Sequence, residues 1–282
     1  MIRILSDSTC DLSEEITKRY GITIIPLHIV LGEEEYRDRV GISQKEIFEW
    51  ADKNKTTPKT SAVSYDDAMS AIRPIADAGD EAIVFTISGA FSTTYNVFSM
   101  VTQDLGVTDR VFVVDSANLS TGIGLLVIEA ALMAREGHKA QDILKEIERL
   151  RPKVRASFVI DTLTYLARGG RCSSVAALTG GVLRIHPKII VKDGRMEVSK
   201  KYRGSIKRVV MDYVKDMHYA LLEARPARVF ITHTSSDREL VEEVRSYLES
   251  LGHFDEILET EAGGVISSHC GPGTLGVLFI EG

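Results

Sequence analysis

The chain has 282 residues, of which 44% are hydrophobic and 26% charged, a balance typical of globular proteins. Its 34 Lys and Arg against 40 Asp and Glu give a formal net charge of −6, which argues against nucleic-acid binding because that needs a basic face. The three cysteines, Cys10, Cys172 and Cys270, are widely separated, so we expect reduced thiols in a cytoplasmic protein. The longest apolar run, interrupted by Glu129, is too short to span a bilayer, and no secretory signal is evident; we therefore expect no stable membrane insertion.

The first half of the chain alternates strand and helix patterns. In chain order it predicts a strand at 2–5, a helix at 12–20, a strand at 23–30, a helix opened by a Ser43/Glu46 capping box, a polar loop at 56–61 and a helix from Ser64 to about Gly79. A strand at 82–85, a helix at 95–105, a strand at 110–114 and helices at 122–135 and 140–150 follow. Such alternation is typical of a mostly parallel sheet flanked by helices.

A domain boundary is expected near Pro152, which gives two α/β domains, 1–153 and 154–282. The second half predicts a strand at 158–160, a short helix ending at Gly169-Gly170-Arg171, a hairpin around Asp193-Gly194, a helix at 205–224, a strand at 228–232, a helix at 237–251, a strand at 257–261, a Gly- and Pro-rich loop at 263–273 and a strand at 275–280.

The segment Thr86–Tyr95 is the first candidate binding site, because its hydroxyls lie where a buried strand passes into a helix. In a parallel sheet this position is at the carboxyl end of a strand, where ligands bind. Hydroxyls and free amides at a helix start suit a phosphate or a carboxylate. Helix capping by the same Ser and Thr residues is the alternative interpretation.

The second candidate is His269, which lies in the Gly- and Pro-rich loop. A lone His is more often a structural hydrogen-bonder than a functional group, and no Cys or His cluster accompanies it to suggest a metal site. No GxGxxG or GxxxxGK[ST] motif indicates a nucleotide. Ser92, His269 and an Asp form a hypothetical nucleophile triad, although Ser92 is not in a GxSxG elbow. A binder of small anions or sugar phosphates is a third hypothesis.

Several short polar and glycine-containing stretches are spread over almost the whole chain: Ser6–Thr9 with Asp11-Leu12, Thr60-Ser61 with Ser64, Ser88–Tyr95, Asp115-Ser116, Leu163–Arg171, Gly264–Ile266 and His269 with Gly271–Gly273. In their order and spacing, these stretches together resemble the DegV family of fatty-acid-binding proteins. The resemblance implies two α/β domains that hold a long-chain fatty acid between them, with its tail in an apolar tunnel and no cofactor or metal. It also implies a set of carboxylate-binding residues: Thr60, Ser61, Ser92, Thr93 and His269.

The resemblance further implies that the chain is a non-catalytic subunit that presents the fatty acid to a separate ATP-dependent kinase, with Arg171 facing the phosphoryl transfer or the partner. The alternative is an acyl-ester or thioester hydrolase that uses Ser92 and His269. The apolar helix at 122–135 is either a wall of the tunnel or plain core. The chain departs from the family pattern at Val63, where the family usually has Pro, at Thr93, where it has Gly, and at His186-Pro187-Lys188, where it has Lys-Pro-Ile.

Overall fold

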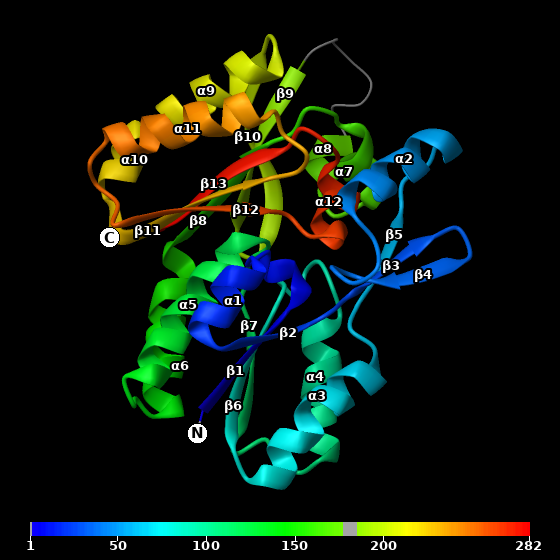
Figure 1. Cartoon of the computed structure of the whole chain (residues 1–282), viewed down its shortest axis with the longest axis vertical. Coiled ribbons are helices and arrows are strands. Elements are labelled where there is room, and N and C mark those ends of the chain that lie inside the picture. The colour runs from blue at the N-terminus through cyan, green and yellow to red at the C-terminus, as the bar shows by residue number, and fades with distance from the viewer. Residues whose placement is uncertain (1, 177–184) are drawn as a thin grey trace.

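Four strands from the first half of the chain form a parallel sheet in the computed structural model, which describes residues 2–176 and 185–282 (Figure 1). The order is β2-β1-β6-β7, with bounds Ile2–Asp7 for β1, Ile22–Ile25 for β2, Glu81–Thr86 for β6 and Val111–Asp115 for β7. Strand β6 is almost entirely buried, as expected for a central strand of a sheet covered on both faces. The predicted α/β fold with a parallel N-terminal sheet is confirmed.

Helices cover both faces of this sheet. One face carries α3 (Tyr65–Ala78) and α4 (Thr94–Asp104), and the other carries α1 (Glu14–Tyr20), α5 (Thr121–Arg135) and α6 (Ala140–Leu150). Helix α2 (Gln44–Asn54) begins with the capping box predicted at Ser43 and Glu46. At Ser64, which precedes α3, only half of a capping box forms. The Ser64 side chain accepts from the Asp67 amide, but the Asp67 carboxylate contacts the Ser64 hydroxyl and His28.

The second half forms a six-stranded sheet in the order β10-β9-β8-β13-β11-β12, in which only β11 and β12 pair in parallel among the described strands. Its bounds are Val154–Val159 for β8, Ile185–Lys192 for β9, Arg195–Arg203 for β10, Ala224–His233 for β11, Glu256–Glu261 for β12 and Leu275–Glu281 for β13. The predicted hairpin is confirmed, since Asp193 and Gly194 both have positive φ, 48° and 73°, as a tight two-residue turn requires.

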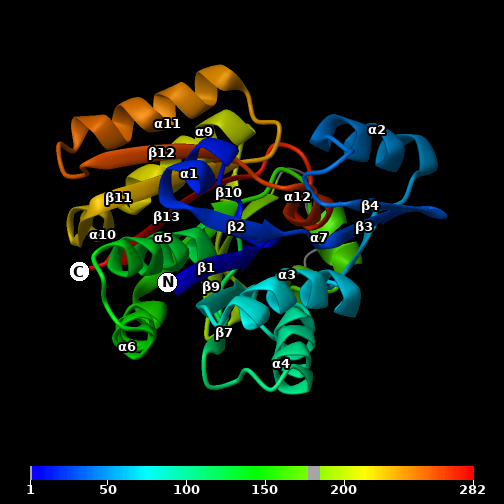
Figure 2. The same ribbon diagram turned by 60° about the horizontal axis from the view of Figure 1, so that its bottom comes forward.

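Helices α9 (Ile206–Asp216), α10 (His218–Leu222) and α11 (Arg238–Ser250) cover the outer face of the six-stranded sheet. On its inner face lies α5, which therefore packs between the two larger sheets (Figures 1 and 2). Two 3-10 turns, Ser8–Cys10 and Arg151–Lys153, and two short helices, α7 (Thr164–Gly169) and α8 (Ser173–Ala176), complete the connections.

A third sheet, in the order β4-β3-β5, was not predicted. Its strands are His28–Leu31 for β3, Glu34–Arg37 for β4 and Lys59–Ser61 for β5. The single strand expected at 23–30 was wrong, because Pro26 lacks an amide for the ladder and the chain leaves one sheet for another there. The loop expected at 56–61 was also wrong, since Thr60 pairs with Ile29 on β3.

Two further predictions were wrong about helices. The helix expected at 205–224 is interrupted at Met217, which has φ −93° and ψ 6°, and Ala224 already belongs to β11. The loop expected at 263–273 contains helix α12 (Gly264–Cys270), which is buried except at His269. Helix α12 packs beside β3, β5 and α2, on the side of the molecule away from α6 (Figure 2).

The hydrophobic core does not divide at residue 153. The four- and three-stranded sheets use only strands before this residue, and the six-stranded sheet uses only strands after it. One buried cluster nevertheless joins Ile4 and Phe85 to Phe158 and Leu278 through α5. The division into domains 1–153 and 154–282 stays a prediction. Helix α5 is core, as one of the two interpretations held, because none of its residues lines the cavity described next.

Candidate functional site

A cavity of about 480 Å³ opens where the three-stranded sheet, the β6–α4 loop and α12 meet. Both halves of the chain contribute to its wall. The lining residues are Leu27, Thr60, Ser61, Ala62, Ile87, Gly89, Ala90, Phe91, Ser92, Thr93, Leu119, Arg171, Met196, Val265, Ile266, His269 and Cys270. The structure therefore brings together all five residues predicted to bind a carboxylate, and Arg171 with them.

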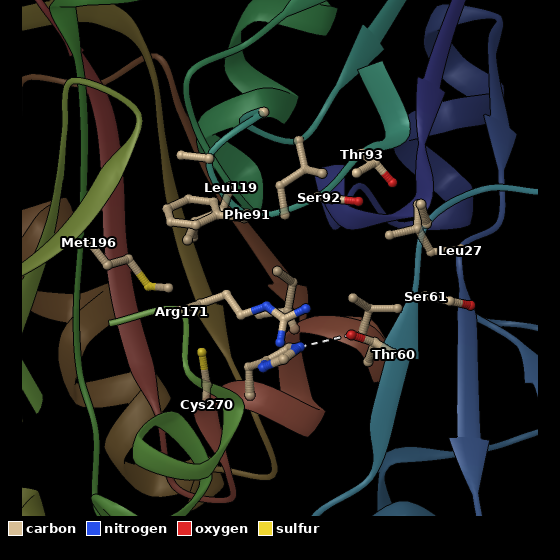
Figure 3. Close-up of a pocket in the computed structure, with 17 residues that line it drawn as sticks. Leu27, Thr60, Ser61, Phe91, Ser92, Thr93, Leu119, Arg171, Met196 and Cys270 are labelled. Carbon is tan, nitrogen blue, oxygen red and sulfur yellow. Dashed lines mark hydrogen bonds between the residues drawn. The ribbon is translucent and has the colours of Figure 1, made fainter. Parts of the chain in front are cut away.

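Thr60 and His269 meet at the polar side of this cavity. The Oγ1 of Thr60 on β5 lies 2.8 Å from the Nε2 of His269 on α12, although 209 residues separate them in sequence. Successive residues of a strand point to opposite faces, and the Ser61 hydroxyl accordingly points away from that of Thr60 (Figure 3). The Ser61 hydroxyl is therefore less well oriented to bind a carboxylate in the cavity than the sequence suggested.

The Ser/Thr segment forms the adjoining part of the wall. The Ser92 hydroxyl lies 2.9 Å from the Thr94 hydroxyl and accepts from the Thr94 amide at 3.3 Å, so it supports the first turn of α4 while lining the cavity. The N-cap of α4 is Thr93, whose side chain makes no capping hydrogen bond, so cavity lining is the better description of this segment. Ser88 has another role, because its buried hydroxyl donates to the Gly194 carbonyl at 2.7 Å and joins this loop to the β9–β10 turn.

Apolar side chains face these hydroxyls across the cavity. In Figure 3, Phe91, Leu119 and Met196 lie on one side, and Thr60, Ser92 and Thr93 lie on the other. A second hollow of about 20 Å³ lies against the six-stranded sheet, with Phe158, Gly276 and Leu278 in its wall. Leu119, Ile266 and Cys270 line both spaces, so these three side chains form the partition between them.

His269 is neutral at physiological pH. Burial, and to a lesser extent the positive charge of Arg171, lower the pKa of His269 to about 4. Its Nδ1 is buried without a hydrogen-bond partner and lies against Gly169, where an added Cβ would overlap it. Arg171 is exposed, donates to the Gly169 carbonyl at 2.7 Å, and extends its guanidinium toward Thr60 (Figure 3).

The hypothetical triad of Ser92, His269 and an Asp does not assemble. His269 pairs with Thr60 through Nε2, and its Nδ1 has no carboxylate among the described residues. Ser92 pairs with Thr94. Since a nucleophilic serine needs a base and the base needs an orienting acid, the local geometry lacks the relay on which the hydrolase hypothesis depends.

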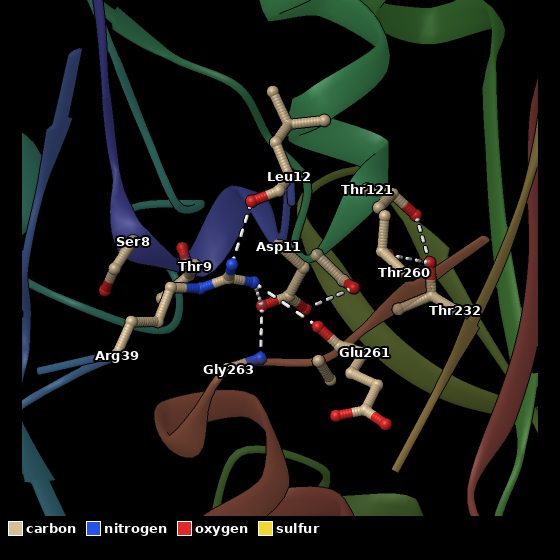
Figure 4. Close-up of polar contacts among 12 residues, drawn as sticks. Ser8, Thr9, Asp11, Leu12, Arg39, Thr121, Thr232, Thr260, Glu261 and Gly263 are labelled. Atoms are coloured by element: carbon tan, nitrogen blue, oxygen red, sulfur yellow. Dashed lines mark hydrogen bonds and ion pairs between the residues drawn. The ribbon is translucent and has the colours of Figure 1, made fainter. Parts of the chain in front are cut away.

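The polar segment after β1 forms a buried network that the sequence did not reveal. Ser13 caps α1, whereas the segment from Ser6 to Asp11 turns inward. Asp11 accepts from the Gly263 amide at 2.7 Å and from the Ser120 hydroxyl at 2.6 Å, while Arg39 lies beside it (Figure 4). In the sequence, the polar run from Ser6 to Asp11 was the feature that could have indicated this network. Its partners Gly263 and Ser120 lie far away in sequence, and no local pattern marks them.

Across 2–176 and 185–282, no group of three or more His, Cys, Asp or Glu side chains is placed to hold a metal ion. Within the same residues, no helix is both long and apolar enough to cross a membrane.

Comparison with known proteins gives consistent matches over the whole length. The family model described as "Uncharacterised protein, DegV family" matches residues 1–282. A DegV domain-containing protein of Caldanaerobacter subterraneus subsp. tengcongensis is 32% identical, over 99% of both chains. A solved structure of a DegV family protein from Thermus thermophilus, described for its fatty acid binding, has a TM-score of 0.91 at 31% identity and covers 99% of both chains. A stearic-acid-binding protein from Eubacterium ventriosum has a TM-score of 0.84 at 28% identity, covering 100% of this chain and 98% of its own.

Proposed function

The chain belongs to the DegV family, and on that premise we propose that it binds a long-chain fatty acid in the cavity beside Thr60, Ser92 and His269. The observation that carries the proposal is the division of one cavity into a side with hydroxyls and an imidazole and a side of apolar side chains. A fatty acid has the same division. The matching relatives from Thermus thermophilus and Eubacterium ventriosum, described as fatty-acid binders, support the same ligand class.

The carboxylate is held by neutral donors under this proposal. A carboxylate taken out of water must be hydrogen-bonded or paired. Hydroxyls of Thr60, Ser92 and Thr93 are available for this, and the first turn of α4 adds the positive end of a helix dipole. His269 contributes as a neutral group, because the pKa of about 4 leaves it uncharged at pH 7. Arg171 also lines the cavity, but in this proposal it faces the partner and is not one of the carboxylate ligands.

The tail supplies most of the affinity. Burial of each CH₂ contributes about 0.8 kcal/mol, so a long acyl chain outweighs a handful of polar contacts. The cavity volume of about 480 Å³ lies within the range usual for small-molecule sites. We place the tail along Phe91, Leu119 and Met196, with its end directed to the partition of Leu119, Ile266 and Cys270 and the hollow behind it.

We further propose that the chain is a non-catalytic subunit that presents the bound acid to a separate ATP-dependent kinase. The exposed position of Arg171 at the cavity mouth supports this role, since a partner can reach its guanidinium there. The incomplete triad also favours presentation over hydrolysis of an ester.

Extraction of the purified protein with organic solvent, followed by mass spectrometry, tests the ligand class. The expected result is a bound acyl chain, or uptake of added palmitate or oleate by protein that has been stripped of lipid. Protein with no extractable acyl chain that also fails to take up either acid would overturn the proposal. Binding that inorganic phosphate displaces and fatty acids do not would replace it with a small-anion site.

A further inference from the structure

We propose that Asp11 and Asp38 are positioning residues for the fatty-acid site, and that they act by fixing helix α12 and the His269 side chain it carries. The inference rests on the proposed function, because it concerns the same cavity. Neither carboxyl group lines the cavity. Both are nearly inaccessible to solvent, at 0% and 1% exposure, and they act through the backbone at the start of α12.

The two carboxyl groups bind consecutive amides. Asp11 Oδ1 accepts from the Gly263 amide and Asp38 Oδ1 accepts from the Gly264 amide, each at 2.7 Å. These amides belong to the end of a helix, where backbone donors have no partner within the helix. The first turn of α12 is thus held by side chains from two other segments of the chain.

The glycines at this point permit the close approach. A Cβ on Gly263 would lie 3.0 Å from the Asp38 carboxylate and 3.2 Å from that of Asp11. A Cβ on Gly264 would overlap the side chains of Ile29 and Ile47. Since any larger residue would push the carboxyl groups away, the Gly-Gly pair and the two aspartates fit one another as a unit.

Each aspartate is itself anchored to a rigid part of the fold. Asp11 accepts from the hydroxyl of Ser120, which precedes α5, and Arg39 bonds to the Leu12 carbonyl at 2.8 Å beside it. Asp38 accepts from the Ser8 hydroxyl at 2.7 Å, and its amide donates to the Leu27 carbonyl at 2.8 Å. The start of α12 is therefore tied both to the segment after β1 and to the three-stranded sheet.

The other end of α12 is tied to the same small sheet. His269 pairs with Thr60 on β5, while Asp38 directly follows β4, and both strands flank β3. With a rise of about 1.5 Å per residue, the five steps from Gly264 to His269 span about 7.5 Å. A displacement at the first amide of so short a helix reaches the imidazole almost undiminished.

The charges within this cluster are balanced only in part. Asp11 and Asp38 are buried beside the guanidinium of Arg39, and Asp7 is buried close enough to Asp38 to interact with its charge. Burial raises the pKa of Asp7 and Asp11 to about 6 and also raises the pKa of Asp38. Asp7 accepts from the Ile87 amide at 2.7 Å, so the same segment also fixes the loop on the opposite side of the cavity. A buried carboxyl is tolerated when amides and hydroxyls bind it, as they do here.

Two substitutions at Asp38 separate the effect of its hydrogen bond to the Gly264 amide from the effect of its negative charge. A variant at a distant residue serves as the control. Asp38→Ala removes the acceptor for Gly264, whereas Asp38→Asn keeps an acceptor oxygen and the side-chain size. Glu129→Gln is the matched control, because Glu129 is 13% exposed and pairs with Arg228 between α5 and β11, outside the cavity lining. Ser8→Ala, which removes only the hydroxyl that supports Asp38, is the milder variant should Asp38→Ala fail to fold.

The direct measurement is the titration of the His269 ring by NMR in protein without ligand. In Asp38→Ala the ring should leave its buried place, and its pKa should rise from about 4 toward the ordinary value of 6.5. The dissociation constant for palmitate should increase about tenfold in that variant, as loss of well-placed hydrogen bonds implies. Asp38→Asn and Glu129→Gln should have the same His269 pKa and the same dissociation constant for palmitate as the wild type, whatever their melting temperatures.

The outcomes distinguish this inference from the function on which it rests. A folded Asp38→Ala or Ser8→Ala protein with an unchanged His269 titration overturns the positioning role. Equal losses of affinity in Asp38→Ala and Glu129→Gln also overturn it, since general destabilisation would then be the cause. If the wild type binds no fatty acid, the proposed function fails, and the His269 titration still decides whether the aspartates fix α12.

Discussion

Replacement of Gly169 by Ala should weaken fatty-acid binding without weakening the fold. Gly169 is the last residue of α7, and a Cβ at this position would overlap the Nδ1 of His269. The backbone at Gly169 does not have positive φ, so Ala is compatible with its conformation. Ala is also favoured over Gly within a helix by about 0.5–1 kcal/mol, which offsets the stability lost when the Thr60–His269 hydrogen bond breaks.

The magnitude follows from the ring that must move. To accept the new methyl group at ordinary contact distance, the imidazole must shift by about 1 Å, since carbon atoms approach non-bonded neighbours to about 3.5 Å. The Thr60–His269 distance is 2.8 Å, so such a shift takes it past the limit of a hydrogen bond. Once displaced, the imidazole also loses its contact with the bound carboxylate, and loss of one such hydrogen bond to the ligand, worth about 0.5–1.5 kcal/mol, weakens binding about two- to tenfold.

Gly170→Ala is the matched control on the next residue. A Cβ at Gly170 would have no atom within 4 Å, but its φ of +68° is unfavourable for Ala. This variant should therefore lose stability by about 1 kcal/mol and keep its affinity, which is the opposite of the expected behaviour of Gly169→Ala.

Isothermal titration with palmitate and urea denaturation measure the two quantities in the three proteins. The reasoning is refuted if Gly169→Ala binds as tightly as the wild type. It is equally refuted if both variants lose affinity in proportion to their loss of stability, because the position of His269 would then be irrelevant.

Three further predictions concern other residues. Ser92→Ala should bind palmitate about tenfold more weakly, because one hydroxyl donor is lost, and neither it nor the wild type should turn over an acyl thioester in a continuous thiol-release assay. Turnover by the wild type that disappears in this variant would restore the hydrolase hypothesis. Because burial raises the pKa of Asp11 from 3.8 to about 6, the folded state holds the extra proton and the stability from this group falls as the pH rises from about 4 to about 6. Asp11→Asn should thus gain free energy of unfolding relative to the wild type over that interval and no more above it; a flat difference would contradict the assignment. Arg171→Ala should retain palmitate but yield less acyl phosphate with a fatty acid kinase and ATP, and loss of binding instead would make Arg171 a ligand of the carboxylate.

The parts of the fold that the sequence predicted are those with a local signal. The β6 strand and the helix α5 are continuous apolar runs, and Ser43 with Glu46 forms a cap within four residues. The three-stranded sheet lacks such a signal. Its β5 strand is polar and only partly buried, and its register is set by β3, about thirty residues away.

The candidate site shows the same limit. Thr60, Ser92 and His269 could be predicted from their motifs, but their meeting depends on the path of the whole chain. The apolar wall gave no signal, since Leu119 or Met196 looks like any core residue in sequence. The sequence analysis also did not single out Asp38 and Arg39. In sequence, a buried Asp looks the same as a solvent-exposed one, and the partner of Asp38, the Gly264 amide, lies 226 residues further along the chain.

The position of β13 has a consequence for how the protein is made. This strand follows β11 and β12 in the chain, yet it lies between β8 and β11 in the sheet. Until β13 has been synthesised, the β8-β9-β10 meander and the β11-β12 pair therefore cannot join into one sheet. Each exposes an unpaired strand edge, and such edges in nascent chains promote aggregation or chaperone binding. Helix α12 immediately precedes β13, so the ribosome delivers the insert that closes the sheet together with the last wall of the cavity. A half-made molecule consequently lacks the Val265, Ile266, His269 and Cys270 wall, and the cavity is complete only when the last segment has folded.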